Sequence, residues 1–206
     1  MASTALLHDP PTPEVDGLLL PPAPDGRARF SREAYHRLGE IGILGSDNRV
    51  ELVDGEILMM SPIGPPQGGL ITRLNKFFTK HLPDIVDCRV QLPIGVNDHS
   101  EPEPDIALVR RQEDDYQVKH PMPSDVFLLI EVAQSSVSYD LGKKLRIYAQ
   151  SHVPEYWVID IGKRIVITHR EPVGATYNQV KSFGAGDAIA PLAAPDCQLD
   201  LNWLFR

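Results

Sequence analysis

Cysteine is scarce in this sequence, and long apolar runs are absent. The two cysteines, Cys88 and Cys197, form neither a disulfide framework nor the close pairs that bind zinc, and we interpret both as small buried residues. No apolar run approaches the ~20 residues that a membrane-spanning helix needs. The first residues lack the basic segment and long apolar run of a secretory signal. We therefore expect a cytoplasmic protein, in a reducing compartment, with no membrane partner.

An excess of positive charge is also missing. The chain has 20 Lys and Arg against 28 Asp and Glu, which gives a formal net charge of -8. Lys and Arg contacts to phosphate supply most of the non-specific affinity for nucleic acid, so this balance argues against tight, indiscriminate coating of DNA. It does not exclude a local basic groove, because the distribution of charge sets the field as much as its sum does.

Residues 1–26 differ in composition from the rest of the chain. They are rich in proline and show no sustained apolar periodicity, which predicts a flexible tail. A short apolar patch at residues 18–20 could dock on the body of the protein or on a partner. Residues 27–206 have the length and apolar content of a single domain with a core of its own.

Apolar periodicity predicts interspersed strands and helices from residue 30 onward. Ser31 is a candidate N-cap for a helix through Leu38, and Asp54-Gly55, which tolerates positive φ angles, predicts a tight hairpin within residues 49–60. Prolines and glycines predict a loop over residues 61–69. Further helices are expected at 70–80, at 140–150 with Asp140 as a cap, and at 201–205; further strands are expected at 86–92, 105–109, 126–132, 155–160, 164–170 and 177–183. This mixture predicts an α/β fold with a mixed central β-sheet flanked by helices.

Two acids stand at the ends of predicted strands. Asp105 follows Pro102 and Pro104 at the start of a short apolar strand, and Glu131 interrupts an almost continuous apolar run. A buried carboxylate is costly unless it is paired or bound to metal, and two of them 4 Å apart repel by about 4 kcal/mol at an effective dielectric of 20. A divalent cation removes that cost. Hard oxygen ligands favour Mg²⁺ or Mn²⁺ as the cofactor.

Two lysines follow on the next predicted helix. At about 100° per residue, Lys144 falls beside Tyr148 at the margin of the buried face, while Lys143 points outward. A lysine near apolar groups and a metal loses some preference for its charged form. Lys144 could then orient or deprotonate water, or neutralise charge that develops on the phosphate, while Lys143 contacts phosphate from the solvent side. Each residue alone has a plainer explanation: Asp105 could start a strand, Glu131 could pair with Arg146, and Lys144 could extend from the helix to solvent. Their order on strand, strand and helix favours a site.

Other candidate residues are weaker. The histidines His99, His120, His152 and His169 are scattered without ligand spacing, and we expect them at the surface. Tyr156 and Trp157 lie in an apolar strand, where a place in the core is favoured over stacking on bases. No phosphate-binding or dinucleotide-binding glycine motif is present.

The ordered set of motifs resembles one known family. It comprises Pro104-Asp105, Glu131 in an apolar strand, the D-x-x-x-K of Asp140 to Lys144, and the segments ELVDGEI, MSPIGP, EYWVID and LDLNWLF. Together they cover about residues 30–205 and are similar to the Uma-two family of endonucleases, within the PD-(D/E)xK nuclease superfamily. The resemblance implies a restriction-endonuclease-like core and metal-dependent cleavage of nucleic acid.

The resemblance also implies roles for individual residues. Asp105 and Glu131 become the metal ligands and Lys144 the catalytic lysine, displaced to a helix from the usual superfamily position, which is Ala133 here. Glu51 in ELVDGE is the candidate for an additional early acid, ahead of Glu56.

Two glutamines belong to the expected cleft. Gln91 faces opposite to its apolar strand neighbours and is expected to line the cleft. Gln67 stands where the family commonly has a histidine. Glutamine cannot shuttle a proton near neutral pH, so activity would be weakened if that histidine assists catalysis; the alternative is that it only shapes the loop.

The sequence thus predicts an Mg²⁺-dependent endonuclease that hydrolyses phosphodiester bonds in nucleic acid, with DNA as the expected substrate. Phosphate contacts are assigned to Lys143, Arg146, Gln91 and Gln67. A homodimer is expected, because cutting both strands often needs two sites. One rival is a catalytically weakened protein that keeps the fold to bind nucleic acid or protein, which the acidic balance and Gln67 favour. A second rival is a metal-free hydrolase of sugars with two carboxylates, for which the sequence shows no sugar platform.

Overall fold

The computed structural model describes residues 19–20, 26–45 and 47–206. Most of the tail expected over residues 1–26 therefore lies outside the described residues, and the division into a tail and one domain stays a prediction. Within that segment, β1 (Leu19–Leu20) pairs antiparallel with β2 (Arg29–Phe30). Among the described helices, none combines the length and apolar character needed to cross a bilayer.

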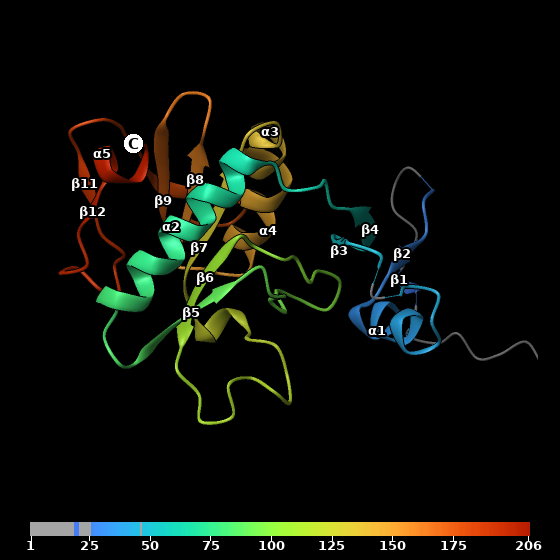
Figure 1. Ribbon diagram of the computed structural model, residues 1–206. Helices are drawn as coiled ribbons and strands as arrows, with labels where there is room; N and C mark the ends of the chain where they lie inside the picture. The colour runs from blue at the N-terminus through green and yellow to red at the C-terminus, as the bar shows by residue number, and fades with distance from the viewer. Residues whose placement is uncertain (1–18, 21–25, 46) are drawn as a thin grey trace, which may run out of the picture.

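A mixed sheet of six strands organises the described part of the chain (Figure 1). Its strand order is β10-β9-β8-β7-β6-β5, and the strands are β5 (Val86–Val90), β6 (Ile106–Arg110), β7 (Val126–Ala133), β8 (Glu155–Asp160), β9 (Ile165–Val173) and β10 (Thr176–Phe183). Only β7 and β8 run parallel within this sheet, since a helical segment connects them. The predicted α/β fold with a mixed central sheet is confirmed.

Apolar side chains cover both faces of this sheet. On one face, β7 residues Leu128, Ile130 and Val132 pack with α2 (Pro65–His81) and α5 (Leu201–Leu204). On the other face, β7 residues Leu129 and Ala133 pack with α4 (Leu145–Gln150). Burial on both faces explains why β7 is an almost unbroken apolar run, and it places Glu131 on the face of α4 because side chains alternate along a strand.

A smaller unit of β1, β2, α1 (Arg32–Glu40), β3 (Val50–Val53) and β4 (Glu56–Met59) lies to one side of the sheet (Figure 1). Ser31 caps α1 by accepting a hydrogen bond from the amide of Ala34 at 3.1 Å, as predicted. Asp54 and Gly55 form the predicted hairpin turn with φ of 53° and 76°. The amide of Glu101 donates to the carbonyl of Leu52 at 2.7 Å, and this bond ties β3 to the segment that leads into Asp105.

Two predicted boundaries are wrong in ways that affect the site. The expected loop at 61–69 ends early, because α2 begins at Pro65 with prolines in its first two positions, where an amide would have no partner in the helix. The expected helix at 140–150 begins earlier, with α3 (Val137–Tyr139), a π-turn η2 (Asp140–Lys144) and then α4. Asp140 is therefore not an N-cap.

The remaining elements are short. They are η1 (Pro123–Asp125), β11 (Ala188–Ile189) and β12 (Leu199–Asp200). β11 and β12 pair with each other, and Asp200 caps α5 by accepting from the amides of Asn202 and Trp203. The predicted short helix at the end of the sequence is confirmed.

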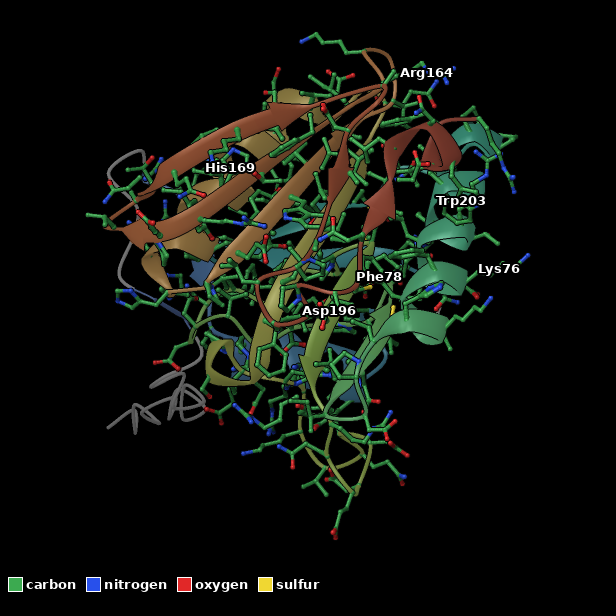
Figure 2. All side chains as sticks on the ribbon, turned by 90° about the vertical axis from the view of Figure 1, so that its left-hand side faces the viewer. Lys76, Phe78, Arg164, His169, Asp196 and Trp203 are labelled. Atoms are coloured by element: carbon green, nitrogen blue, oxygen red, sulfur yellow. The ribbon has the colours of Figure 1, made fainter. Side chains whose placement is uncertain are left out.

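The surface position expected for His169 is wrong. Its side chain lies on β9 and is 3% exposed (Figure 2). The ring stacks on Tyr156 with a centroid distance of 5.6 Å, and its Nδ1 lies 3.2 Å from the Tyr156 carbonyl oxygen. Burial lowers the pKa of His169 below its ordinary value.

His169 should make the protein sensitive to acid. A lowered folded-state pKa means that its contribution to stability is present above about pH 6.5 and is lost as the pH falls towards the folded-state pKa. We expect His169→Asn, which keeps an N–H donor but cannot be protonated, to lose less stability than the native protein between pH 7.5 and 5.5. Urea unfolding at both pH values measures this. Equal losses in the two proteins would contradict it.

Candidate active site

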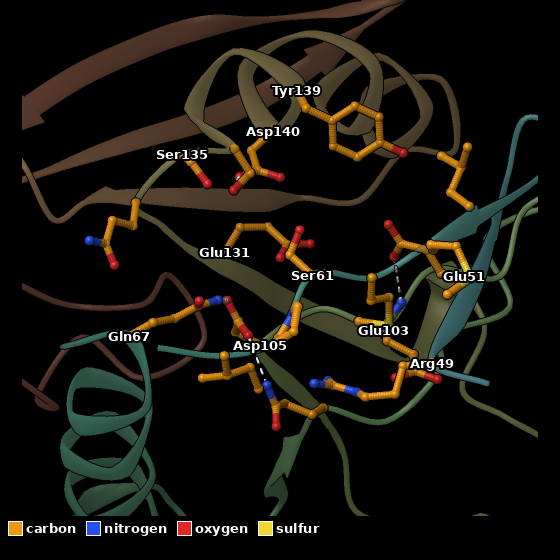
Figure 3. Close-up of a pocket in the computed structure, with 18 of the residues that line it drawn as sticks. Arg49, Glu51, Ser61, Gln67, Glu103, Asp105, Glu131, Ser135, Tyr139 and Asp140 are labelled. Atoms are coloured by element: carbon orange, nitrogen blue, oxygen red, sulfur yellow. Dashed lines mark hydrogen bonds between the residues drawn. The ribbon is translucent and has the colours of Figure 1, made fainter. Parts of the chain in front are cut away.

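A pocket of ≈ 470 Å³ opens beside the sheet, between the β3–β4 hairpin, the start of α2 and the α3–η2 segment (Figure 3). Five acids line it: Glu51, Glu103, Asp105, Glu131 and Asp140. Among the described residues of the lining, the basic side chains are Arg49 and Lys144. The pocket is therefore acidic as a whole, although two cations are built into it.

Asp105, which directly precedes β6, and Glu131 of the neighbouring antiparallel strand β7 both reach the pocket. Ile106 of β6 is paired with Ile130 of β7, so the next residues along, Asp105 and Glu131, lie opposite each other on one face. The amide of Val132 donates to Asp105 Oδ2 at 2.8 Å, and Gln91 Nε2 donates to Asp105 Oδ1 at 3.1 Å. These bonds fix the Asp105 carboxylate beside Glu131.

Lys144 joins Glu131 to Glu51. Its Nζ lies 2.9 Å from Glu131 Oε1 and 3.0 Å from Glu51 Oε2, and its side chain is 6% exposed. The hydroxyl of Tyr148 also donates to Glu131 Oε1, at 3.1 Å. The extra residue of the π-turn shifts the helical register at this point, and Lys144 turns from the expected margin of the helix into the interior.

The expected loss of charge preference at Lys144 is wrong. Burial alone lowers the pKa of Lys144, but Glu131, Glu51 and Asp140 together outweigh it and raise the pKa well above its ordinary value. These carboxylates therefore favour the protonated, cationic form of Lys144. It can hold carboxylates in place and neutralise negative charge that develops on a substrate.

Burial raises the pKa values of Asp105 and Glu131, whereas it acts to lower that of Lys144. Burial raises the pKa of Asp105, although hydrogen bonds from the Val132 amide and from Gln91 partly offset it. Burial also raises the pKa of Glu131 well above its ordinary value; Lys144 opposes this, and the charges of Asp140, Asp105 and Glu51 add to it. One lysine does not compensate these carboxylates, so additional positive charge would be stabilised in the pocket.

The donor set fits a magnesium ion. Within the part of the chain that the structure describes, no group of three or more His, Cys, Asp or Glu side chains could hold a metal. Mg²⁺ does not need such a cage, because it usually keeps several waters and binds through one or two carboxylates and a substrate phosphate. Asp105 and Glu131 are the pair of hard oxygen ligands that would hold such an ion.

The other residues named from the sequence divide into two groups. Gln91 and Gln67 both line the pocket, and Gln67 Nε2 lies 3.5 Å from Asp105 Oδ2. Lys143 instead pairs with Glu56, and neither of these lines the pocket. Arg146 is exposed and also outside it, so the alternative that Arg146 pairs with Glu131 is wrong. The phosphate contacts assigned to Lys143 and Arg146 are not brought to this pocket.

Four ionisable pocket residues were given no place in the site by the sequence reasoning: Arg49, Glu103, Tyr139 and Asp140. Asp140 had a usable signal, because it precedes Lys144 by four residues and this spacing puts both on one helical face. Tyr139 precedes Asp140 in the sequence, and no sequence signal pointed to a place for it in the pocket. Arg49 begins the predicted hairpin and Glu103 lies just before a predicted strand, and no local pattern connects either of them with the pocket. Arg49 forms no ion pair with any described residue and points into the pocket (Figure 3).

Comparison with known proteins identifies a matching family and a solved structure with a similar fold. The chain matches the Uma2 family, described as "Putative restriction endonuclease", over residues 32–202. Its fold is similar to a crystal structure described as "a putative nuclease belonging to DUF820 from Anabaena variabilis", with a TM-score of 0.68 and 17% sequence identity. The match covers 85% of this chain and 97% of that chain, and at this identity it shows the fold alone. No curated protein matches the chain significantly.

Proposed function

The chain belongs to the Uma2 family of restriction-endonuclease-like proteins, and from this premise we propose that it is a metal-dependent endonuclease acting on DNA. The observation that carries the proposal is the convergence of Asp105, Glu131 and Lys144 on one pocket. Asp105 directly precedes β6, Glu131 lies on β7 and Lys144 ends η2, so folding brings three separate segments together. A purely structural role would not need an open pocket beside two largely buried carboxylates.

Each residue has a role in the proposed reaction. Asp105 and Glu131 hold Mg²⁺, which when bound supplies Lewis-acid polarisation of the scissile phosphate and a more acidic water. Lys144 remains protonated and neutralises negative charge that develops on the phosphate oxygens. Glu51 holds Lys144 from the side opposite Glu131.

The substrate contacts differ from those expected from the sequence. We assign the phosphate contact at the mouth of the pocket to Arg49, because its guanidinium forms no ion pair with any described residue and suits phosphate geometry. Gln67 and Gln91 orient Asp105. A homodimer in the cytoplasm, with one site for each DNA strand, completes the proposal.

Cleavage of supercoiled plasmid tests this function. We expect nicking with Mg²⁺ or Mn²⁺, none with EDTA, and a loss of about 1,000-fold in Asp105→Asn, because metal stabilisation of a transition state is worth several kcal/mol. Asp87→Asn is the matched control, since Asp87 pairs with Arg111 away from the pocket.

Three outcomes would overturn the proposal. DNA binding without cleavage would favour a non-catalytic binding protein. Cleavage that resists the chelator would remove the metal from the mechanism. Equal cleavage by the native protein and Asp105→Asn would mean that the site lies elsewhere.

A further inference from the structure

Tyr139 lies at the wall of the pocket with no role assigned so far. It is the last residue of α3, directly before the π-turn that carries Lys144. Figure 3 shows its ring at the edge of the pocket. Lys144 Nζ lies 5.9 Å from the centroid of the ring.

The hydroxyl of Tyr139 is buried and has no hydrogen-bond partner among the described residues. A buried hydroxyl without a partner is unusual and unfavourable. The sequence contains six tyrosines, and each of the other five donates its hydroxyl to a defined acceptor: Tyr35 to Val50, Tyr116 to Arg110, Tyr148 to Glu131, Tyr156 to Asp140 and Tyr177 to Val153. Tyr139 is therefore an exception within its own protein.

The chemistry of this hydroxyl limits what it can bind. Burial and the nearby charge of Glu51 raise the pKa of Tyr139 above its ordinary value, so the phenol stays protonated at neutral pH and acts as a donor. None of the residues that the structure describes supplies the acceptor. In a pocket that also holds a lysine cation, the acceptor expected of a nucleic-acid substrate is a phosphate oxygen.

We propose that the Tyr139 hydroxyl donates a hydrogen bond to a non-bridging oxygen of the scissile phosphate, beside Lys144. This inference rests on the proposed function and adds a substrate contact to it. Lys144 balances the charge of the phosphate, and Tyr139 fixes the orientation of one of its oxygens. Because no described residue accepts from this hydroxyl, the donor is available to the substrate.

Tyr139→Phe removes only the hydroxyl. We expect the variant to be as stable as the native protein, since no described hydrogen bond is lost, and to cleave about 10- to 100-fold more slowly, the range for a hydrogen bond to a charged group. Tyr177→Phe is the matched control, because it breaks the bond to the Val153 carbonyl outside the pocket. It should lose stability and keep its cleavage rate.

A phosphorothioate substrate separates direct contact from an indirect effect. Sulfur in place of the contacted oxygen should slow the native enzyme in one stereoisomer and slow Tyr139→Phe less in that same isomer. Native-like cleavage by Tyr139→Phe would overturn this inference and leave the nuclease proposal standing. A slower variant with an unchanged sulfur effect would also overturn it, because the hydroxyl would then act through water. If the native protein cleaves nothing, the proposed function fails and this inference fails with it.

Discussion

Lys144→Met is expected to lower the free energy of unfolding by about 3–5 kcal/mol, the range for removing one partner of a buried ion pair. The lysine lies within 3.0 Å of Glu51 and 2.9 Å of Glu131, and all three side chains are almost fully buried. Without it, two carboxylates remain in the interior with no counter-ion. Urea unfolding in EDTA, which prevents metal from replacing the lysine, measures the loss.

The neighbouring lysine provides the control. Lys143 pairs with Glu56 where both side chains are partly exposed, 27% and 26%, and such surface pairs are worth about 0–1 kcal/mol. Lys143→Met should therefore change stability little, and it should cleave normally while Lys144→Met loses cleavage. Similar stability losses in the two variants would contradict the buried network around Lys144.

Glu131→Gln is expected to lower the cleavage rate by about 1,000-fold, because it removes a proposed metal ligand. Its free energy of unfolding at pH 7 should stay within about 1 kcal/mol of the native value. The amide oxygen can still accept from Lys144 and Tyr148, as Glu131 Oε1 does now. The substitution also removes a charge that burial disfavours, since the pKa of Glu131 is raised well above its ordinary value. Cleavage rate, Mn²⁺ binding by calorimetry and urea unfolding together measure the effect.

Glu155 is a buried acid for which we expect the opposite result, a loss of stability without a loss of cleavage. It is completely buried but lies outside the pocket, where it accepts from Arg170 at 2.7 Å, from Trp157 Nε1 and from the amide of Leu192. Glu155→Gln should lose stability, because it breaks a buried pair with arginine, and should keep its cleavage rate per folded molecule. Loss of stability without loss of cleavage in Glu131→Gln would make Glu131 a structural residue of the same kind.

These experiments would also distinguish a buried acid with a structural role from a buried acid that binds metal. In Glu155 the charge is compensated by a dedicated arginine. In the pocket, Asp105, Glu131 and Asp140 all have raised pKa values with burial as the main cause. A structure that only needed stability would pair these acids with arginines, whereas a metal site needs them incompletely compensated.

Local signals in the sequence determined most of the elements. Asp54-Gly55 produces the hairpin because few residue types tolerate the positive φ angles of its turn. Ser31 starts α1 because its hydroxyl satisfies a free amide. The apolar run of β7 identifies a central strand, and Glu131 is conspicuous there because an acid in such a run is costly.

Tertiary structure alone decided what surrounds those residues. Whether Lys144 keeps its proton depends on carboxylates from β3 and β7 that meet it only in the fold. The presence of Arg49 and Tyr139 in the pocket, and the absence of Lys143 from it, depend on the π-turn and on the placement of the β3–β4 hairpin. Sequence patterns report on neighbours within a few positions along the chain. The charge and hydrogen bonding of this pocket come from segments up to about a hundred residues apart, and only folding brings those segments into contact.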